Sequence, residues 1–343
     1  MKTNAKIQVR ILKSLHHLNV IEIYQLFQDE PWKYYVSMDA DTVYDELALS
    51  KIIDRVSSAE NVVAATGNIR IVNNCKVDNG IIKNILFPNR ILLGMQVIQY
   101  LRNIVFKRTG LSFLGSELII AGAFGVYQRD IVLACGAYLP NCVGEDMELT
   151  IRVHRYCIEQ NIKYNIILVA DAVAWTESPE NISDVITQGE RWHRGMIDSL
   201  SRHRDMLLNP RYGKIAFIGL PYYFFTQLVA PILELSAWFV FAIGLYYGVI
   251  SWTVFAFFLI VTSGTATLLS MASLLFNKLI FNCYTSKEII FKALPCSIIE
   301  NFGFRQLIIL SQLLSFVHYF KGNRSWKFTD SRKLSTAVNK VQD

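Results

Sequence analysis

The sequence is short of charged residues, of patterned cysteines and of cationic stripes. Only 18% of its 343 residues are charged, whereas soluble domains carry about 25%. The net charge of +6 is not gathered into basic segments interleaved with aromatic residues ahead of the last residues of the chain, so no nucleic-acid partner is expected. The shortage of charge indicates contact with a lipid bilayer, and the positive balance suits an anionic cytoplasmic leaflet.

The six cysteines show neither a C-x-x-C pair nor a regular spacing. This pattern argues against a zinc site or a disulfide scaffold and favours buried, reduced thiols in a cytosolic domain. Residues 1–17 also lack the apolar run of a signal peptide. They contain no leading transmembrane helix either.

The apolar residues are concentrated in one part of the chain. Residues 1–213 have an ordinary soluble composition, whereas residues 214–320 are overwhelmingly apolar. Residues 252–276 carry no charge, and at about 1.5 Å per residue they are long enough to cross a hydrocarbon core about 30 Å thick. Residues 219–249 hold a single charge, Glu234, and two prolines that suggest a division. We predict that the first part of this segment lies in the membrane interface and that the rest crosses.

The last apolar segment, residues 289–320, is interrupted by ionisable residues, namely Lys292, Glu300, Arg305 and His318. Both of its flanks are rich in Lys and Arg, which prefer the cytoplasmic side of a membrane. We therefore predict two spans, then an interfacial or re-entrant segment on the cytosolic side, and finally a basic cytosolic tail at 321–343. A third full span is the alternative.

The first acidic motif of the soluble part follows a predicted strand. Residues 32–38 are rich in aromatic and β-branched types, which favours a buried strand, and Asp39 and Asp41 follow directly. A helix at 45–58 and a strand at 61–66 would complete an α/β pattern, in which ligands gather at the carboxyl ends of strands. Two carboxylates there can hold a divalent cation that also binds phosphates. The alternative is a polar turn that caps the next helix.

The second acidic motif, Glu145 and Asp146, opens a predicted helix that runs to about residue 160. Carboxylates are common in a first helical turn because they complement the helix dipole. The more specific interpretation is that one of them is a general base for an attacking hydroxyl.

The third motif lies in a predicted helix at 181–204, where Gln188, Arg191 and Trp192 share one face. An amide, a guanidinium and an indole can together hold a diphosphate and stack on a sugar ring. Alternatively, the Trp lies in the core and the Arg on a solvated rim. His193 and His203 of the same helix are expected at solvated polar positions.

The order of these motifs is more specific than any one of them. The sequence YYVSMDADT, then IAGAFGVYQRD, then GEDMELTIRVHR, then QGERWHRG, followed by apolar helices, resembles the processive family 2 glycosyltransferases. That family includes cellulose, hyaluronan, chitin and poly-N-acetylglucosamine synthases, and the resemblance covers roughly residues 30 to 330. It implies an α/β fold, with a GT-A-type nucleotide-sugar transferase domain followed by α-helical membrane segments.

The resemblance assigns Asp39 and Asp41 to the metal site, where Mg²⁺ or Mn²⁺ would hold the donor diphosphate. It assigns Asp146 the role of catalytic base, with Glu145 beside it. The family motif has Thr where this chain has Gly144, a change that we expect to be tolerated because it lies outside the carboxylates.

The resemblance also supplies residues that bind donor and acceptor: Gln188, Arg191, Trp192, Gly122, Ala123 and Phe124. Many relatives carry Arg where this chain has Gly189, so one cationic contact is expected to be missing. The implied reaction is an inverting transfer from a nucleotide sugar, expected to be a UDP-sugar, to a growing glycan or glycolipid at the cytosolic membrane face.

Only 38 residues precede Asp39, and the apolar spacing within residues 16–30 suits one helix. We therefore expect the domain at 1–213 to lack its N-terminal nucleotide-binding part, either by truncation or because a partner subunit supplies it. The membrane region would occupy 214–320. An inactive remnant that binds a glycan or a partner is the alternative function, and a small transporter with a soluble appendage is a more distant one.

Overall fold

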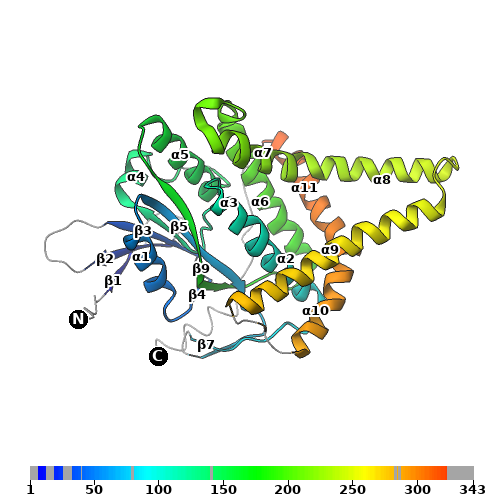
Figure 1. Ribbon diagram of the computed structural model, residues 1–343, viewed down its shortest axis with the longest axis horizontal. Coiled ribbons are helices and arrows are strands. Elements are labelled where there is room, and N and C mark those ends of the chain that lie inside the picture. The colour runs from blue at the N-terminus through cyan, green and yellow to red at the C-terminus, as the bar shows by residue number, and fades with distance from the viewer. Residues whose placement is uncertain are drawn as a thin grey trace.

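The computed structural model describes residues 7–12, 19–25, 33–39, 41–78, 81–139, 142–281, 284 and 287–322, the first two segments as backbone only. The predicted basic tail lies almost entirely outside these residues. The described part is an α/β domain from which apolar helices extend (Figure 1). This arrangement confirms the predicted fold class.

The strands of the described residues are β1 (Ile7–Leu12), β2 (Asn19–Gln25), β3 (Tyr34–Met38), β4 (Thr42–Tyr44), β5 (Val62–Ile71), β6 (Lys76–Asp78), β7 (Ile81–Asn84), β8 (Gly125–Gln128) and β9 (Asn165–Thr176). The main sheet has the order β1-β2-β3-β8-β5-β9-β4, and β6 pairs with β7 separately. Within the main sheet β5 and β9 are parallel, and the other described pairs are antiparallel.

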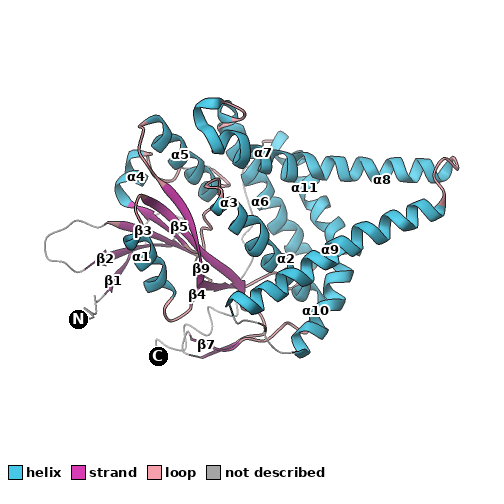
Figure 2. Ribbon diagram, viewed as in Figure 1, coloured by secondary structure: helices cyan, strands magenta, loops and turns pink. Residues whose placement is uncertain are grey.

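The α-helices are α1 (Ala48–Ser58), α2 (Ile91–Arg102), α3 (Thr109–Phe113), α4 (Arg129–Ala134), α5 (Glu145–Glu159), α6 (Ile182–Arg202), α7 (Leu220–Tyr223), α8 (Ala230–Tyr246), α9 (Trp252–Phe281), α10 (Lys287–Ile299) and α11 (Arg305–Phe320). In the described part of the chain, four π-helical segments interrupt or join them, namely η1 (Asn103–Arg108), η4 (Ile215–Gly219), η5 (Phe224–Val229) and η6 (Glu300–Phe304). Two 3-10 turns in the same part are η2 (Arg204–Met206) and η3 (Pro210–Tyr212). Helices and strands are distinguished by colour in Figure 2.

The predicted strands at 32–38 and 61–66 and the predicted helices at 45–58, 145–160 and 181–204 are all present, with small shifts at their ends. The helix expected within residues 16–30 is wrong. Residues 19–25 instead form β2, which pairs with β1 on one side and with β3 on the other. Pairing with the two neighbouring strands makes residues 19–25 a strand. A short run of apolar residues does not by itself distinguish a strand from a helix.

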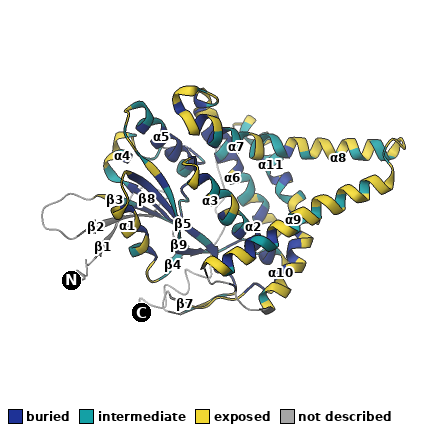
Figure 3. Ribbon diagram, in the orientation of Figure 1, coloured by how far each residue is buried: buried dark blue, intermediate teal, exposed yellow. Residues whose placement is uncertain are grey.

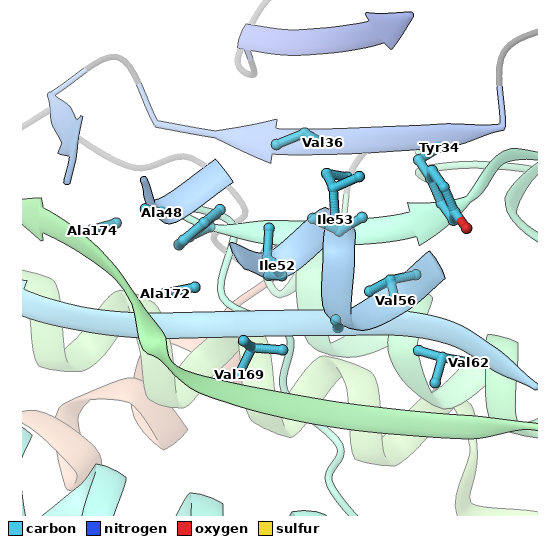
Figure 4. Close-up of a cluster of buried hydrophobic side chains, with 13 residues drawn as sticks. Tyr34, Val36, Ala48, Ile52, Ile53, Val56, Val62, Val169, Ala172 and Ala174 are labelled. Atoms are coloured by element: carbon cyan, nitrogen blue, oxygen red, sulfur yellow. The ribbon is translucent and has the colours of Figure 1, made fainter. Parts of the chain in front are cut away.

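Helix α1 covers one face of the sheet. Its apolar residues Ile52, Ile53 and Val56 point into a cluster with Val36 of β3 and Val169 of β9 (Figure 4). Helix α5 covers a second cluster through Leu149 and Val153. Strand β5 is buried along most of its length, as expected for a central strand covered on both sides.

Helices α8 and α9 extend away from the α/β domain and meet at a tight turn (Figures 1 and 3). Within the described residues, Ile215–Tyr246 and Trp252–Ile280 are long and apolar enough to cross a membrane. The two helices contact each other through aromatic rings near the turn, including Phe241 with Phe255 and Phe258. Their outer surfaces are exposed and apolar, with Tyr246, Trp252 and Phe257 each at least 68% exposed.

The prolines do not divide the first of these helices. Pro221 and Pro231 lie in the first turns of α7 and α8, and each follows a π-helical segment. A wider turn accommodates the missing N–H and the proline ring, so the helix continues from Ile215 to Tyr246. The part of it that lies in a membrane interface stays a prediction.

Residues 287–320 form α10 and α11, joined at a kink where Phe302 and Gly303 leave helical geometry. This pair is not among the helices that meet the length and hydropathy of a span. Each ionisable residue that interrupts the segment has a partner: Lys292 with Glu288, Glu300 with Arg102, Arg305 with Glu234 and His318 with Glu190. These contacts attach α11 to α6 and α8, and η6 to α2.

Candidate active site

Asp39 and Asp41 lie in a tight turn at the carboxyl end of β3. The carbonyl oxygen of Asp39 accepts a hydrogen bond from the amide of Thr42, 3.2 Å away, where β4 begins. Both carboxylates are half-buried. The turn therefore places two acidic side chains at the carboxyl end of an inner strand of the sheet. Ligands of α/β proteins bind outside the carboxyl ends of strands.

The loop at 121–124 lies directly beside this turn. Ser37 near the end of β3 is paired with Gly125 at the start of β8. A Cβ atom built on Gly122 would lie 3.7 Å from Asp39 Oδ1. The ring of Phe124 stacks on Tyr44, with centroids 4.3 Å apart, and the Tyr44 hydroxyl lies 3.3 Å from the carbonyl oxygen of Ala123.

Glu145 and Asp146 form the first turn of α5. Asp146 Oδ1 accepts a hydrogen bond from the amide of Met147 at 2.8 Å, and the amide of Gly122 also bonds to this carboxylate. The Thr150 hydroxyl donates to the main-chain carbonyl of Asp146 at 2.7 Å. Both the loop and the helix end thus set the direction in which the Asp146 side chain points.

Helix α6 carries Arg191 to the same place by a close backbone crossing. A Cβ atom on Gly144 would lie 2.5 Å from the carbonyl oxygen of Gly195, and one on Gly195 would lie 2.7 Å from Gly144 Cα. The Ser199 hydroxyl donates to the carbonyl of Gly144 at 3.1 Å. Gly195 packs in the space that a side chain at position 144 would occupy. The close packing of the two helices therefore accounts for Gly144 at the position where the family motif has Thr.

Gly189 has a similar explanation. A Cβ atom there would lie 2.6 Å from the Ser311 hydroxyl of α11, so the packing of α11 on α6 leaves no room for a larger residue. Helix packing therefore occupies the position where a cationic contact was expected to be missing.

Electrostatic interactions show that the acidic motifs and Arg191 lie together. Burial raises the pKa of Asp39 to about 6, with the charges of Asp41 and Asp146 adding to the rise and Arg191 opposing it. Burial raises the pKa of Glu145 to about 7, again with contributions from Asp146 and Asp39 and opposition from Arg191. Motifs more than a hundred residues apart in the chain thus share one electrostatic environment.

The other two acids behave alike. Burial raises the pKa of Asp41 above its ordinary value, and Arg191 opposes the rise. Burial also raises the pKa of Asp146, and the amides of Met147 and Gly122 oppose it. Arg108 also lowers the pKa of Asp146, but among the described residues the desolvated carboxylates of the cluster still keep raised pKa values, as expected where acids outnumber nearby cations.

Gln188 and Trp192 lie on α6 as predicted. Gln188 is half-buried, and Trp192 is 50% exposed. The interpretation of Trp192 as a core residue is therefore wrong, and its indole face is available at the surface.

The expectation that His193 and His203 are solvated is also wrong. His193 is buried, with its ring nitrogens 2.5 Å from the Ser315 hydroxyl and 2.8 Å from the Gln227 carbonyl oxygen. His203 is buried against Glu148 at 3.2 Å. Through these contacts both histidines join neighbouring helices.

Four tyrosines of the described residues interact with charges of the cluster and were not found from the sequence. Tyr44 interacts with Asp39, Tyr100 of α2 with Asp41 and Arg191, Tyr138 with Asp146 and Glu145, and Tyr127 with Asp146. Burial raises the pKa of all four phenols. Tyrosine is common in this chain, and only the fold distinguishes these four from the rest.

The donor set fits a hard divalent cation. Within the described part of the chain no three His, Cys, Asp or Glu residues are grouped as a metal site. Asp39 and Asp41 nevertheless offer carboxylate oxygens whose mutual repulsion and burial a cation would relieve. Phosphate oxygens of a ligand commonly complete the coordination of such an ion.

Comparison with known proteins gives three findings. Residues 35–279 match the family model described as Glycosyl transferase family group 2. Poly-beta-1,6-N-acetyl-D-glucosamine synthases of Staphylococcus epidermidis and Staphylococcus aureus are 27% and 25% identical over 171 residues, 50% of this chain and 37% of theirs. The chain thus matches well under half the length of these curated relatives. A mannosyltransferase from Pyrobaculum calidifontis, solved in complex with GDP-Man and Mn²⁺, is similar with a TM-score of 0.46 and 11% identity, over 86% of this chain and 64% of that one.

Proposed function

This chain belongs to glycosyl transferase family group 2, and from that premise we propose that it moves a sugar from a nucleotide-diphosphate sugar to a growing polysaccharide or glycolipid, with inversion at the anomeric carbon. The observation that carries the proposal is the convergence of Asp39, Asp41, Asp146 and Arg191. An anionic diphosphate needs cationic partners, and an attacking hydroxyl needs a base within reach.

In the proposed reaction Asp146 takes the proton of the acceptor hydroxyl while that oxygen bonds to the anomeric carbon. The bond from that carbon to the phosphate oxygen breaks, and the nucleoside diphosphate leaves. The amides of Met147 and Gly122 orient the Asp146 carboxylate. Its raised pKa makes it a better base than a solvated aspartate.

Arg191 is the proposed partner of the leaving diphosphate. Its guanidinium lies close enough to Asp39, Asp41 and Glu145 to lower the pKa of each. A planar guanidinium matches phosphate oxygens and stays charged at all relevant pH values. Gln188 and the exposed indole of Trp192 are proposed to contact donor and acceptor from the same helix, and Gly122, Ala123 and Phe124 to face the acceptor.

Asp39 and Asp41 are the proposed ligands of Mg²⁺ or Mn²⁺. The ion, when bound, neutralises negative charge on the diphosphate. Binding of the ion is expected to lower the pKa of Asp39, because the ion compensates the burial and the repulsion from neighbouring acids that raise it.

The donor is proposed to be a UDP-sugar, and the names of the curated relatives suggest UDP-N-acetylglucosamine as the first to test. The chain is proposed to be a multi-pass protein of the cell membrane with its catalytic domain in the cytosol. Support comes from the two candidate spans and from the cationic flanks of residues 287–320.

The test compares the full chain with Asp146→Asn, both in membranes with Mn²⁺ and UDP-N-acetylglucosamine, then with other UDP-sugars. We expect transfer and donor hydrolysis by the wild type and a loss of about 10²–10⁴-fold in turnover by the variant, with little change in donor KM. Binding of UDP and Mn²⁺ to both proteins provides the control for folding. Equal, background-level turnover with every donor would contradict catalysis and favour a chain that only binds a glycan or a partner.

A further inference from the structure

A buried set of polar side chains lies behind the candidate active site. Arg108, at the end of η1, is 7% exposed. Its Nη2 atom donates to the carbonyl oxygen of Ile119 at 2.5 Å and to the Thr66 hydroxyl at 3.2 Å. Its Nε atom faces Glu117 Oε2 at 3.8 Å. Neither of these two atoms has a hydrogen-bond partner among the described residues, and their opposite charges face each other inside the protein.

Glu117 connects this set to the first candidate span. The residue is fully buried, and its Oε1 atom accepts from the Ile119 amide at 3.0 Å and from the Tyr223 hydroxyl at 3.2 Å. Tyr223 is also fully buried. The span packs closely here, because a Cβ atom on Gly219 would lie 2.8 Å from the carbonyl oxygen of Ser116.

Thr66 of β5 connects the set to the loop at 121–124. Its fully buried hydroxyl lies 3.4 Å from the amide of Ala121 and 3.3 Å from the carbonyl oxygen of Phe124. The next amide, that of Gly122, reaches the Asp146 carboxylate. A series of hydrogen bonds, joined by the Arg108–Glu117 ion pair and by the main chain of residues 121–122, therefore runs from the first candidate span to the proposed catalytic base.

We propose that Thr66, Arg108 and Glu117, here named the loop anchor, hold residues 119–124 in a fixed position relative to Asp146. That position then depends on the packing of Tyr223 and on its hydrogen bond to Glu117. The three are positioning residues, since none of them is placed to touch a substrate. The anchor acts on the transfer step, and its consequence for activity rests on the proposed function. A small displacement of a catalytic group lowers turnover strongly without changing the affinity for a distant part of the substrate.

Two conservative substitutions, Thr66→Val and Tyr223→Phe, test the anchor. Thr66→Val keeps the shape of the side chain and removes its hydroxyl, whereas Thr66→Ser keeps the hydroxyl. Tyr223→Phe removes only the hydroxyl that reaches Glu117. The matched control is Tyr222→Phe, a half-buried neighbour on the same helix with no hydrogen bond to Glu117 among the described contacts.

The direct readout is hydrogen–deuterium exchange by mass spectrometry on the full chain in lipid nanodiscs. The amides of Ile119 and Ala121 are protected by side chains of the anchor and not by a strand ladder. We expect peptides that cover 117–124 to exchange at least about tenfold faster in Thr66→Val and Tyr223→Phe. Thr66→Ser and Tyr222→Phe should match the wild type. Unchanged exchange in both disruptive variants overturns the anchor, whatever the activity.

The second readout is kinetic, with UDP-N-acetylglucosamine and Mn²⁺. We expect about a tenfold loss of kcat in Thr66→Val and Tyr223→Phe with donor KM within about twofold, and recovery in Thr66→Ser. Equal loss in kcat and donor affinity would show general destabilisation and contradict a positioning role. If the wild type transfers no sugar, the proposed function fails, and the exchange experiment still decides whether the anchor exists.

Discussion

At the scale of single residues, burial makes carboxylate charge costly and at the same time useful. Asp39 and Glu145 have raised pKa values because the fold removes them from water and places other acids nearby. Arg191 offsets part of that cost. Sites that bind cations and polyanions combine these same features, a cluster of acids with limited access to water and a guanidinium beside it.

His154 provides a residue-scale prediction about stability. It is 1% exposed; its Nε2 atom lies 2.8 Å from the Glu117 carbonyl oxygen and its Nδ1 atom 2.8 Å from the Tyr164 hydroxyl. The carbonyl can only accept, so Nε2 carries the proton and Nδ1 accepts from the tyrosine. Burial lowers the pKa of His154 to about 4.

The unfolded chain, with an ordinary histidine pKa, binds this proton first as the pH falls from 6.5 toward 4. The stability contributed by neutral His154 is therefore complete above pH 6.5 and is lost below it, by about 1.4 kcal/mol per pH unit. His154→Gln can keep both hydrogen bonds and does not titrate. Between pH 7 and pH 5 we expect the free energy of unfolding to fall by about 2 kcal/mol more in the wild type than in the variant. Thermal unfolding at the two pH values measures this difference. Parallel pH dependences of the two melting temperatures would contradict this assignment.

At this scale the motifs led to the acids and to Arg191 but not to the residues that support them. Asp39, Asp41, Asp146 and Arg191 each belong to a short pattern of residue types at fixed spacing. Thr66, Arg108 and Tyr100 belong to none, because their partners lie on other strands and helices. A lone polar residue in an apolar run has no local signal of what it bonds to.

At the scale of elements, the crossing of α5 and α6 determines how far Asp146 lies from Arg191. The backbones meet at Gly144 and Gly195, where no side chain fits. The sequence contains both glycines, but only the contact between α5 and α6 shows that both are needed for the two backbones to approach. The helix ends themselves were predictable, since acidic residues open α5 and an asparagine caps α6.

Gly195→Ala should therefore separate the two helices. We expect a loss of about 1–3 kcal/mol in the free energy of unfolding, and a loss of turnover that persists at temperatures where the variant is fully folded. Thermal unfolding and donor turnover measure the two effects. Gly110→Ala is the matched control, since a Cβ atom there meets nothing within 4 Å. Wild-type turnover in Gly195→Ala would show that this crossing does not set the geometry of the site.

At the scale of the whole molecule, the apolar helices α8 and α9 form a hairpin that leaves the α/β domain on one side (Figure 1). Their exposed apolar faces need lipid or other apolar partners. Glu234, the one charge of the first candidate span, is paired with Arg305 of α11 at 2.7 Å, so the span does not present an unpaired charge.

Crossing of the membrane by this hairpin can be tested with single cysteines in a background without the native ones. Ser251 lies exposed in the turn between the two candidate spans, and Ser57 lies exposed on α1. We expect a membrane-impermeant maleimide to label Ser251→Cys in intact cells and to label Ser57→Cys only after the membrane is opened. Labelling of both positions in intact cells, or of neither, would contradict two spans with a cytosolic catalytic domain.

The sequence by itself determined the elements that local patterns encode: the strands before and after the acidic turn, the helices of the second and third motifs, and the apolar segments. These follow from side-chain periodicity and composition, which act within a few residues. The tertiary structure decided β2, where pairing with two neighbouring strands forms the element, and the unbroken helix through Pro221 and Pro231. It also decided which glycines allow helices to touch, which ions neutralise one another, and how Thr66, Arg108 and Glu117 reach the loop beside Asp146, because each of these depends on contacts between residues far apart in the chain.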